Sequence, residues 1–258
     1  MILQGKKGLT TGIINKRSIA YGIAKTLSEH GAELAITYQN ETIKEKLLPI
    51  ASELNVELIL HCNVSNEETI DNSFKEIKDK WGAIDFLVHA IAFSDQNELN
   101  GKYINTSLNN FINAMHISCY SFTALAQRAE KMMLNGGNLL TLSYYGAEKV
   151  MPNYNVMGLC KAALEASVKY IACDLGPQNI RVNAISAGPI RTLASSGISH
   201  FHSISEWNRS NSPLRRNVTI EDVGKAALYL LSDLSSGTTG EILHVDSGYN
   251  VVGMKIVD

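Results

Sequence analysis

Short apolar runs alternate with longer amphipathic stretches along the whole chain, and this alternation limits the folds open to it. Several runs are continuously apolar, as expected for strands buried on both faces of a parallel sheet. Parallel neighbours need a crossover between them, which is usually a helix. The predicted strands are Lys7–Thr11, Glu33–Gln39, Val56–Val64, Ile84–Ile91, Asn138–Tyr144, Arg181–Ser186 and Glu241–Val245. The predicted helices are Ser18–His30, Glu41–Leu54, Glu67–Trp81, Ser107–Leu134, Tyr154–Leu175 and Ile220–Ser232.

This order of elements predicts an α/β fold: a Rossmann-like, doubly wound parallel sheet of seven strands in a single domain spanning residues 1–258. The chain has 258 residues, 45% of them hydrophobic, which suits one large core better than the alternative of two small domains. The stretch 187–216 contains no predicted element. Irregular segments of that length are typical of lids and binding loops.

Composition excludes several classes of protein. The net charge is −2 and no basic run is present, so we expect no nucleic-acid partner. No apolar stretch approaches the roughly 20 residues of a membrane helix, and we expect neither a signal peptide nor stable membrane association. The four cysteines are widely spaced, without a C-x-x-C pair, as in reduced cytoplasmic proteins. No metal site is predicted.

The turn after the first predicted strand is a candidate phosphate site. It runs from Thr10 to Gly22 and opens the first predicted helix, where a Rossmann fold holds the pyrophosphate of a dinucleotide. It lacks the G-x-G-x-x-G pattern, since only Gly12 and Gly22 are glycines. Ser18 can cap the helix and offer its hydroxyl to a phosphate. The alternative is a plain strand–helix turn.

The end of the second predicted strand favours NADH over NADPH. Tyr38–Glu41 contains no Arg or Lys for a 2′-phosphate, and Glu41 would repel one, although Lys44 follows one turn later. Gln39 can hydrogen-bond the ribose hydroxyls. Asn63, after the third predicted strand, has an amide suited to the adenine edge, or is an ordinary turn residue.

Tyr154 and Lys161 are the strongest catalytic candidates. Seven helical residues make almost two turns, which would place both side chains on one helix face roughly 10 Å apart along the axis. The alternatives are a half-buried tyrosine and a solvated lysine. Tyr145 and Lys149 also have the Y-x-x-x-K spacing of ordinary short-chain reductases. However, Gly146 and Pro152 predict a loop there.

The Tyr154–Lys161 spacing suggests reduction of a carbon–carbon double bond. Hydride addition to a double bond conjugated with a thioester creates an enolate, whose charge a phenol can stabilise. A nearby ammonium would favour the phenolate and make the phenol a better proton donor. Relative to Y-x-x-x-K, the tyrosine would lie about 4.5 Å further along the helix, nearer the remote enolate oxygen. Tyr144 could add a second phenol, and Met157 is equally suited to the core or to the cleft wall.

Several blocks of sequence resemble the bacterial NADH-dependent enoyl-acyl-carrier-protein reductases, a divergent branch of the short-chain dehydrogenase/reductases. The resemblance covers nearly the whole chain. The matching blocks are Gly12 with Ser18–Ala24, Gly31–Ala35 with Tyr38–Asn40, Leu142–Tyr144 with Gly146–Glu148, Pro152–Leu159 with Lys161–Ala162, Arg181–Ala194, and Thr219–Gly224.

The resemblance implies a role for each matching position. Tyr154 would be the phenol at the enolate, Tyr144 a second phenol, and Lys161 the group that binds the nicotinamide ribose. The implied NADH site consists of Gly12, Ser18, Ile19, Gln39, Asn63, Val64, Ile91, Ile190 and Thr192, together with Lys161. The implied substrate site consists of Ala92, Tyr144, Tyr154 and Met157, and Ala194 begins a mobile substrate-binding loop. The implied protein is a homotetramer that reduces trans-2-enoyl thioesters on acyl carrier protein, the last step of fatty-acid elongation.

Two departures from the family pattern bear on binding. Ala90–Ala92 replaces the usual Ser-Ile-Gly, which adds a methyl group at Ala92 where the phenolic inhibitor of the family binds. Relatives often have Lys or Arg in the helix corresponding to Ser199–Ser203, where this chain has His200 and His202. Because histidines are mostly neutral at pH 7, we expect the attraction for the acidic carrier protein either to be weaker or to come from Arg209, Arg215 and Arg216 instead.

Two other functions stay open on the sequence. A carbonyl reductase acting on 3-oxoacyl thioesters would have the same fold, but it would need Tyr145 and Lys149 on a helix. A non-catalytic NAD-binding module could keep Gly12 and Ser18, but it would have no need of Tyr154 and Lys161.

Overall fold

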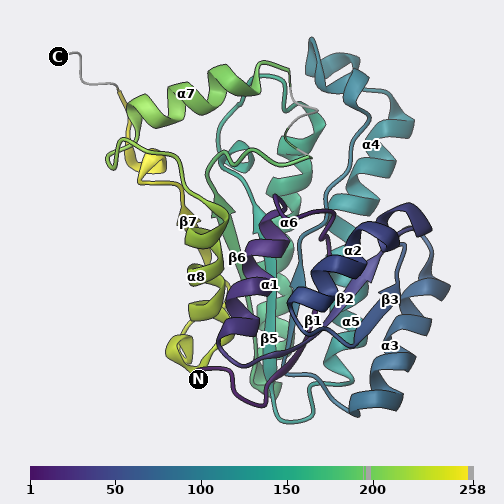
Figure 1. Cartoon of the computed structure of the whole chain (residues 1–258). Helices are drawn as coiled ribbons and strands as arrows, with labels where there is room; N and C mark the ends of the chain where they lie inside the picture. Colours follow the sequence, from purple (N-terminus) through teal and green to yellow (C-terminus); the bar gives the residue numbers. More distant parts are fainter. Residues whose placement is uncertain (194, 196–198, 255–258) are drawn as a thin grey trace.

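Seven parallel strands form one sheet in the computed structural model, which describes residues 1–193, 195 and 199–254 (Figure 1). Their order in the sheet is β3-β2-β1-β4-β5-β6-β7, and every pair is parallel. The strands are β1 Lys7–Thr10, β2 Glu33–Tyr38, β3 Leu58–His61, β4 Phe86–His89, β5 Gly137–Ser143, β6 Ile180–Ala187 and β7 Ile242–Val245. The predicted doubly wound parallel sheet is therefore confirmed.

The direction of winding reverses between β1 and β4, which lie side by side at the centre of the sheet. In open α/β sheets, ligands bind in the crevice outside the carboxyl ends of the strands at such a reversal. The turn containing Gly12 follows β1, and Ala90–Ala92 follows β4. The topology therefore brings these two predicted site segments together.

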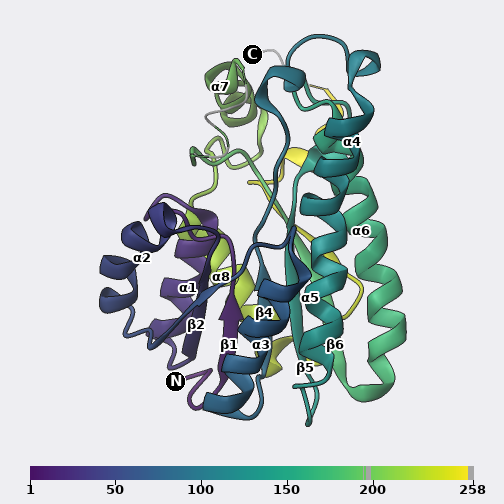
Figure 2. The same cartoon turned by 90° about the vertical axis from the view of Figure 1, so that its right-hand side faces the viewer.

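Helices cover both faces of the sheet. Figure 2 shows α1, α2 and α8 on one side of the strands, and α3, α5 and α6 on the other. These six helices are α1 Ile19–Glu29, α2 Glu41–Glu53, α8 Ile220–Leu231, α3 Glu67–Trp81, α5 Ser121–Glu130 and α6 Val156–Leu175. Each layer buries an apolar cluster against the sheet, one around Leu9 and Leu87 and the other around Ile36 and Val88. Burial of these apolar faces drives the layers together.

The helix predicted over Ser107–Leu134 is interrupted, and that prediction is wrong in its continuity. It consists of α4 Leu108–Met115, a π-helical turn at His116–Tyr120 and then α5. A π turn inserts one extra residue into the helical ladder. The interruption turns the buried hydroxyl of Ser118 toward the backbone of Phe93, with which it makes two hydrogen bonds.

The sequence-based prediction for Tyr154 is also wrong: this residue does not belong to α6. The helix begins at Val156, and residues 152–155 form a turn ahead of it. Asn155, at the N-cap, has φ 39° and ψ −122°, which no helical residue adopts. Tyr154 and Lys161 therefore do not lie on one continuous helix face, and the 4.5 Å displacement inferred from helical spacing does not apply.

The stretch 187–216, predicted as irregular, contains the helix α7 Phe201–Asn211. Figure 1 shows α7 at the top of the molecule, beyond the carboxyl ends of the central strands. Ala194, where the substrate loop was predicted to begin, and residues 196–198 lie outside the described residues. Across the part of the chain that is described, no helix combines the length and apolar character needed to cross a bilayer.

Candidate active site

A cavity of about 970 Å3 opens at the carboxyl edge of the sheet. The turn after β1, the ends of β2 to β6, the start of α6 and part of α7 contribute to its walls. Every site residue predicted from the sequence lines this cavity: Gly12, Ser18, Ile19, Gln39, Asn63, Val64, Ile91, Ala92, Tyr144, Tyr154, Met157, Lys161, Ile190 and Thr192. Segments far apart in the sequence thus converge on one concave site, as in most enzymes.

Gly12 allows the β1 turn to pass directly over the end of β4. Its φ is 85°, and a Cβ built at this position would lie 2.0 Å from the carbonyl oxygen of Ala90. No side chain fits there, and the left-handed conformation independently favours glycine. The exposed backbone of the turn can therefore approach a bound pyrophosphate closely.

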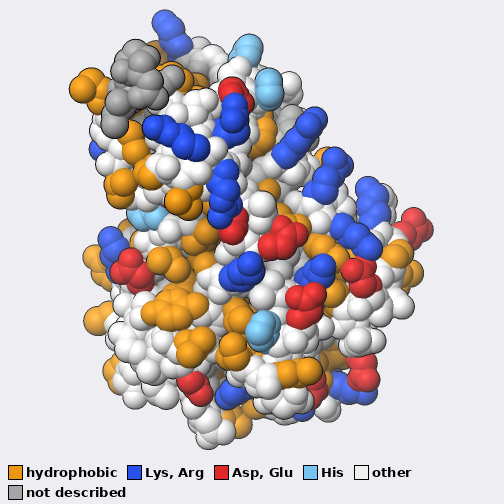
Figure 3. All heavy atoms as spheres, turned by 60° about the vertical axis from the view of Figure 1, so that its left-hand side comes forward, with side chains coloured by type: hydrophobic (Ala, Val, Ile, Leu, Met, Phe, Trp, Pro, Cys, Tyr) orange, Lys and Arg blue, Asp and Glu red, His pale blue; other side chains and the backbone are white. Residues whose placement is uncertain are grey.

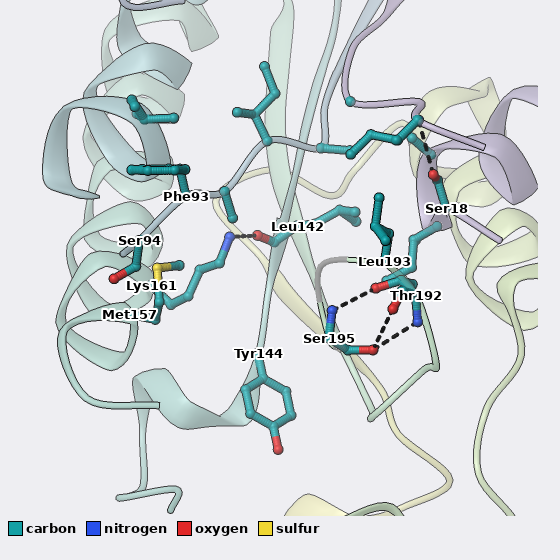
Figure 4. A pocket seen from close by; sticks show the side chains of 18 of the residues that line it. Ser18, Phe93, Ser94, Leu142, Tyr144, Met157, Lys161, Thr192, Leu193 and Ser195 are labelled. Carbon is teal, nitrogen blue, oxygen red and sulfur yellow. Dashed lines mark hydrogen bonds between the residues drawn. The ribbon is translucent and has the colours of Figure 1, made fainter. Parts of the chain in front are cut away.

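Ser18 occupies the N-cap position of α1, but its side chain does not cap the helix as predicted. Its Oγ instead accepts hydrogen bonds from the backbone N–H groups of Ile14, at 3.1 Å, and Asn15, at 3.2 Å (Figure 4). These bonds fold the turn around the serine. The hydroxyl hydrogen of Ser18 is left to donate to a phosphate at the positive end of the helix.

The far end of the cavity has the features expected of a ribose site without a 2′-phosphate. Gln39 lines the cavity, whereas Lys44 does not. The Lys44 ammonium lies 3.2 Å from the Glu41 carboxylate and 5.2 Å from the centroid of the Tyr38 ring. Both contacts engage the Lys44 ammonium, the group considered above as a partner for a 2′-phosphate. Asn63 lines the cavity too, with its Oδ1 accepting the Ser65 N–H at 3.1 Å.

Lys161 lies at the centre of the cavity on α6 and is only 6% exposed. Its ammonium donates a hydrogen bond to the Leu142 carbonyl oxygen at 2.8 Å, which fixes the side chain against the end of β5 (Figure 4). Burial lowers the pKa of Lys161 to about 8, because a charged ammonium loses hydration there. It remains a cation at neutral pH with hydrogens left for a ribose hydroxyl.

Tyr154 and Tyr144 form a pair of phenols in the cavity wall. Their ring centroids are 5.0 Å apart and their planes meet at 73°, an edge-to-face contact. Figure 4 shows the Tyr144 hydroxyl directed away from the Lys161 ammonium. Burial raises the pKa of both phenols, and the neighbouring Tyr144, Cys160 and Glu165 raise the pKa of Tyr154 further.

The prediction that Lys161 favours the Tyr154 phenolate is therefore wrong in its net effect, because burial has the largest influence on this pKa. Tyr154 is 9% exposed, and the cost of burying a charged phenolate outweighs any attraction to the ammonium. The phenol keeps its proton over the ordinary pH range. It can therefore act as a hydrogen-bond or proton donor.

The Tyr145–Lys149 pair lies outside the cavity, as its predicted loop implies. Tyr145–Ala147 forms only a single 3-10 turn. The Tyr145 ring packs at 89° against the Tyr249 ring, with centroids 5.8 Å apart. Its hydroxyl points to the Asn250 carbonyl oxygen, 3.5 Å away. The Y-x-x-x-K spacing therefore does not form a reductase site here.

The segment after β6 supplies the wall opposite Lys161. The Thr192 N–H donates to Ser195 Oγ at 2.8 Å, and the Ser195 N–H donates to Thr192 Oγ1 at 3.1 Å (Figure 4). The Ser195 hydroxyl also donates to the Thr192 carbonyl oxygen at 3.0 Å, so both backbone groups of Thr192 are bonded to Ser195. These bonds hold Thr192 at the cavity wall, close to Ile190.

The sequence did not reveal the wall formed by Phe93–Leu99. Phe93–Asn97 and Leu99 line the cavity, and the segment ends in the short 3-10 helix η1 Gln96–Leu99. Two buried side chains hold the segment from behind. The side-chain Oδ1 of Asn110 accepts the Asp95 N–H at 2.9 Å, and the Ser118 hydroxyl bonds both backbone groups of Phe93. The position of these residues after the carboxyl end of β4 is the signal that could have identified them.

The donor set of the cavity suits a dinucleotide. Exposed backbone around Gly12, the Ser18 hydroxyl, the Gln39 amide and the Lys161 ammonium follow one another along a continuous cavity. Within the residues that the structure describes, no three His, Cys, Asp or Glu side chains are arranged to hold a metal ion.

Comparisons with known proteins agree with this geometry. A family model described as enoyl-(acyl carrier protein) reductase matches residues 12–250. A curated enoyl-acyl-carrier-protein reductase (NADH) from Rhizobium meliloti is 60% identical over 257 residues, covering 100% of this chain and 94% of its own length. One from Rickettsia typhi is 56% identical over 252 residues, covering 98% of this chain and 97% of its own length.

Solved structures are equally similar. The reductase from Anaplasma phagocytophilum, crystallised with NAD, has a TM-score of 0.97 and 64% identity, and the match covers 100% of this chain and 98% of that one. The Bacillus cereus enzyme, crystallised with NADP+ and an indole naphthyridinone, has a TM-score of 0.96 and 48% identity, over 98% of this chain and 99% of that one. The chain belongs to the enoyl-acyl-carrier-protein reductase family.

Proposed function

We propose that this protein transfers a hydride from NADH to the double bond of a trans-2-enoyl thioester carried by acyl carrier protein. The observation that carries the proposal is the convergence of a protonated Tyr154 phenol, a buried Lys161 ammonium and the Gly12 turn on one cavity. NADH-dependent enoyl reductases at 56–60% identity support the same assignment. This reaction would complete one round of fatty-acid elongation.

Bound NADH would supply the hydride, and this chain's residues would bind and orient it. Gly12, Ser18 and Ile19 would receive the pyrophosphate, and Gln39 and the Asn63–Val64 segment would receive the adenosine. Lys161 would hold a hydroxyl of the nicotinamide ribose while its bond to Leu142 keeps the ammonium in place. Ile91, Ile190 and Thr192 would enclose the nicotinamide.

Tyr154 would act on the substrate oxygen. Addition of a hydride to the β-carbon moves negative charge onto the thioester oxygen, and a phenol donating a hydrogen bond there stabilises that charge. The raised pKa of Tyr154 keeps the proton available for this role. Ala92, Tyr144 and Met157 would line the acyl path, with Tyr144 offering a second hydroxyl.

A 3-oxoacyl reductase is the weaker alternative, because the Tyr145 phenol it would use points away from the cavity. A non-catalytic NAD-binding module leaves the two phenols of the cavity without a role. The test is loss of NADH absorbance with trans-2-enoyl, 3-oxoacyl and no thioester. We expect oxidation of NADH with the enoyl compound. Turnover of the 3-oxo compound alone would contradict the proposal.

The carrier protein would approach from the face that contains α7. Figure 3 shows many Lys and Arg side chains over the upper part of this face. Arg209 and Arg216 are already paired with Glu206 and Asp222, whereas exposed Arg215 donates to the Ser210 carbonyl oxygen. Arg215 is therefore the cation best able to attract an acidic carrier. Arg215→Glu should raise KM for the carrier-bound substrate and leave KM for a coenzyme A thioester unchanged.

We further propose a homotetramer of single-domain subunits in the cytoplasm, with residues 187–216 forming the substrate loop. Exposed apolar side chains on the α4–α6 layer support assembly, among them Leu108, Ile112, Tyr120 and Tyr170. Light scattering on the protein as it elutes from a size-exclusion column should give four times the mass of one chain. A monomer at micromolar concentration would contradict the assembly but not the reaction.

A further inference from the structure

The position of Tyr154 needs an explanation, because α6 does not hold it. The tyrosine lies in the turn ahead of the helix, immediately before Asn155. With φ 39° and ψ −122°, Asn155 has a backbone conformation that residues with a Cβ rarely adopt. Such a conformation persists only where surrounding contacts determine it, and it is often found at functional sites. The contacts that hold Asn155 therefore also hold Tyr154.

Those contacts come from the unpredicted wall of the cavity. The Asn155 side-chain amide donates to the carbonyl oxygens of Glu98 and Leu99, each at 3.1 Å, and lies 3.4 Å from the carbonyl oxygen of Gly101. One amide group thus contacts three backbone carbonyls of a single short segment, which lies 54 to 57 residues earlier in the sequence. Asn155 itself does not line the cavity.

The same segment packs against Tyr154. Leu99 is buried in an apolar cluster with Tyr154, Val156 and Met157, and it also lines the cavity. Gly146 also approaches the Tyr154 ring closely, since a Cβ there would lie 2.5 Å from it. The ring is therefore in contact with two segments, and Asn155 connects the one that contains Leu99 to the turn.

We propose that Asn155 is a positioning residue that holds the Tyr154 phenol and the segment Glu98–Gly101, whose Leu99 lines the cavity, as one unit. The proposal rests on the function proposed above. Asparagine suits the position because it tolerates a positive φ and carries two amide hydrogens. Glycine would relax the backbone but donate nothing, and serine could donate to one carbonyl only.

The test uses Asn155→Gly in the wild-type and Tyr154→Phe backgrounds. Loosening the phenol should lower kcat for the enoyl thioester about 10-fold to 100-fold, as small misplacements of a catalytic group do. KM and Kd for NADH should stay within about twofold of wild type, because Lys161 and the Gly12 turn are untouched. In the Tyr154→Phe background the same substitution should lower kcat no further, since the group it positions is already missing.

The matched control is Asn179→Gly, which relieves another asparagine with a positive φ, 58°, at the start of β6. It should leave kcat unchanged. Asn155→Ser, which keeps one donor, should fall between wild type and Asn155→Gly and serves if the glycine variant does not fold. A kcat near wild type for Asn155→Gly, or an equal loss in both backgrounds, would overturn the proposal.

A second readout does not depend on turnover. With 3-fluorotyrosine at position 154, the fluorine resonance should shift or broaden in Asn155→Gly and stay unchanged in Asn179→Gly. An unchanged resonance in Asn155→Gly would also overturn the proposal. If the wild-type protein reduces no enoyl thioester, the proposed function fails, but the resonance still decides whether Asn155 positions Tyr154.

Discussion

The Tyr154 ring meets the Tyr144 ring edge-on, with centroids 5.0 Å apart, in a cavity wall where burial raises the pKa of both phenols. Two protonated hydroxyl groups therefore border the place where an enolate would form. Tyr154 comes from the turn before α6 and Tyr144 from the end of β5. Their contact ties the start of a helix to the edge of the sheet.

Replacing Tyr154 by Phe should lower kcat by at least about 100-fold, because a positioned proton donor contributes about that much. The affinity for NADH, measured by fluorescence titration, should not change. Tyr145→Phe is the control, since Tyr145 has the Y-x-x-x-K spacing to Lys149 but lies outside the cavity. Equal losses in both variants would mean that the wrong phenol has been assigned.

The pKa of about 8 for Lys161 predicts a pH-dependent cofactor affinity. Below that pH the side chain is an ammonium that can bind a ribose hydroxyl, and above it the charge is lost. The Kd for NADH should therefore rise by about 10-fold or more above pH 8, as expected for loss of a charged hydrogen bond. Lys161→Met should bind weakly at every pH, with no such step. Persistence of the step in Lys161→Met would assign it to another group.

His89 should make the protein sensitive to acid. It lies fully buried on β4 between the Thr141 and Ser121 hydroxyls, and burial lowers its pKa from 6.5 to about 3. Between these values the unfolded chain binds a proton that the folded protein does not, so stability falls as the pH is lowered through this window. Urea titrations should show a smaller acid loss for His89→Gln. His202→Gln, at an exposed site, tests whether any histidine has this effect.

Gly12→Ala should abolish NADH binding, because the new Cβ would lie 2.0 Å from the Ala90 carbonyl oxygen. Gly5→Ala is a matched control: Gly5 also has a positive φ, 75°, but nothing lies within 4 Å of its added Cβ. Gly5→Ala should lose about 1–2 kcal/mol of folding stability to the left-handed conformation, and Gly12→Ala should lose more because of its contact with the Ala90 carbonyl oxygen. Calorimetry with NADH should separate them, and retained binding by Gly12→Ala would exclude close approach of the pyrophosphate.

Glu41→Ala should relax the preference for NADH. The substitution removes a carboxylate from the ribose end of the site and releases the Lys44 ammonium. KM for NADPH should fall by about 3-fold to 10-fold, corresponding to roughly one kcal/mol. Glu45→Ala, which removes a carboxylate one turn further along α2, should change it much less. An unchanged KM for NADPH in Glu41→Ala would show that selectivity lies elsewhere.

The sheet could be predicted because each buried strand is a short apolar run in the local sequence. The topology and the family resemblance together predicted that the turn after β1 and the residues after β2 to β6 belong to one site, and the structure brings them to one cavity. The start of α6 could not be predicted in this way. Val156–Leu175 is helical by composition, but the conformation of Asn155 depends on carbonyl groups at Glu98 and Leu99, remote in sequence.

The π turn and α7 could not be predicted from the local sequence, for related reasons. The continuous helical pattern from Ser107 to Leu134 gives no local sign of an inserted residue, and the benefit of the insertion lies in the contact of Ser118 with Phe93. Phe201–Asn211 is mostly polar, and its few apolar positions give only a weak helical periodicity in the sequence. In each case, tertiary contacts determine the backbone conformation where the local sequence is compatible with more than one.

The π turn at His116–Tyr120 confines the effect of its extra residue to one turn of the helix. Because the bulge absorbs that residue locally, α4 and α5 keep the relative orientation that a regular helix would give them. Deleting Ser118 should therefore leave Asn110 beside Asp95 and Ser121 beside His89, and remove the two hydrogen bonds to Phe93. One inserted residue thus supplies the rear support of Phe93 without disturbing the buried histidine.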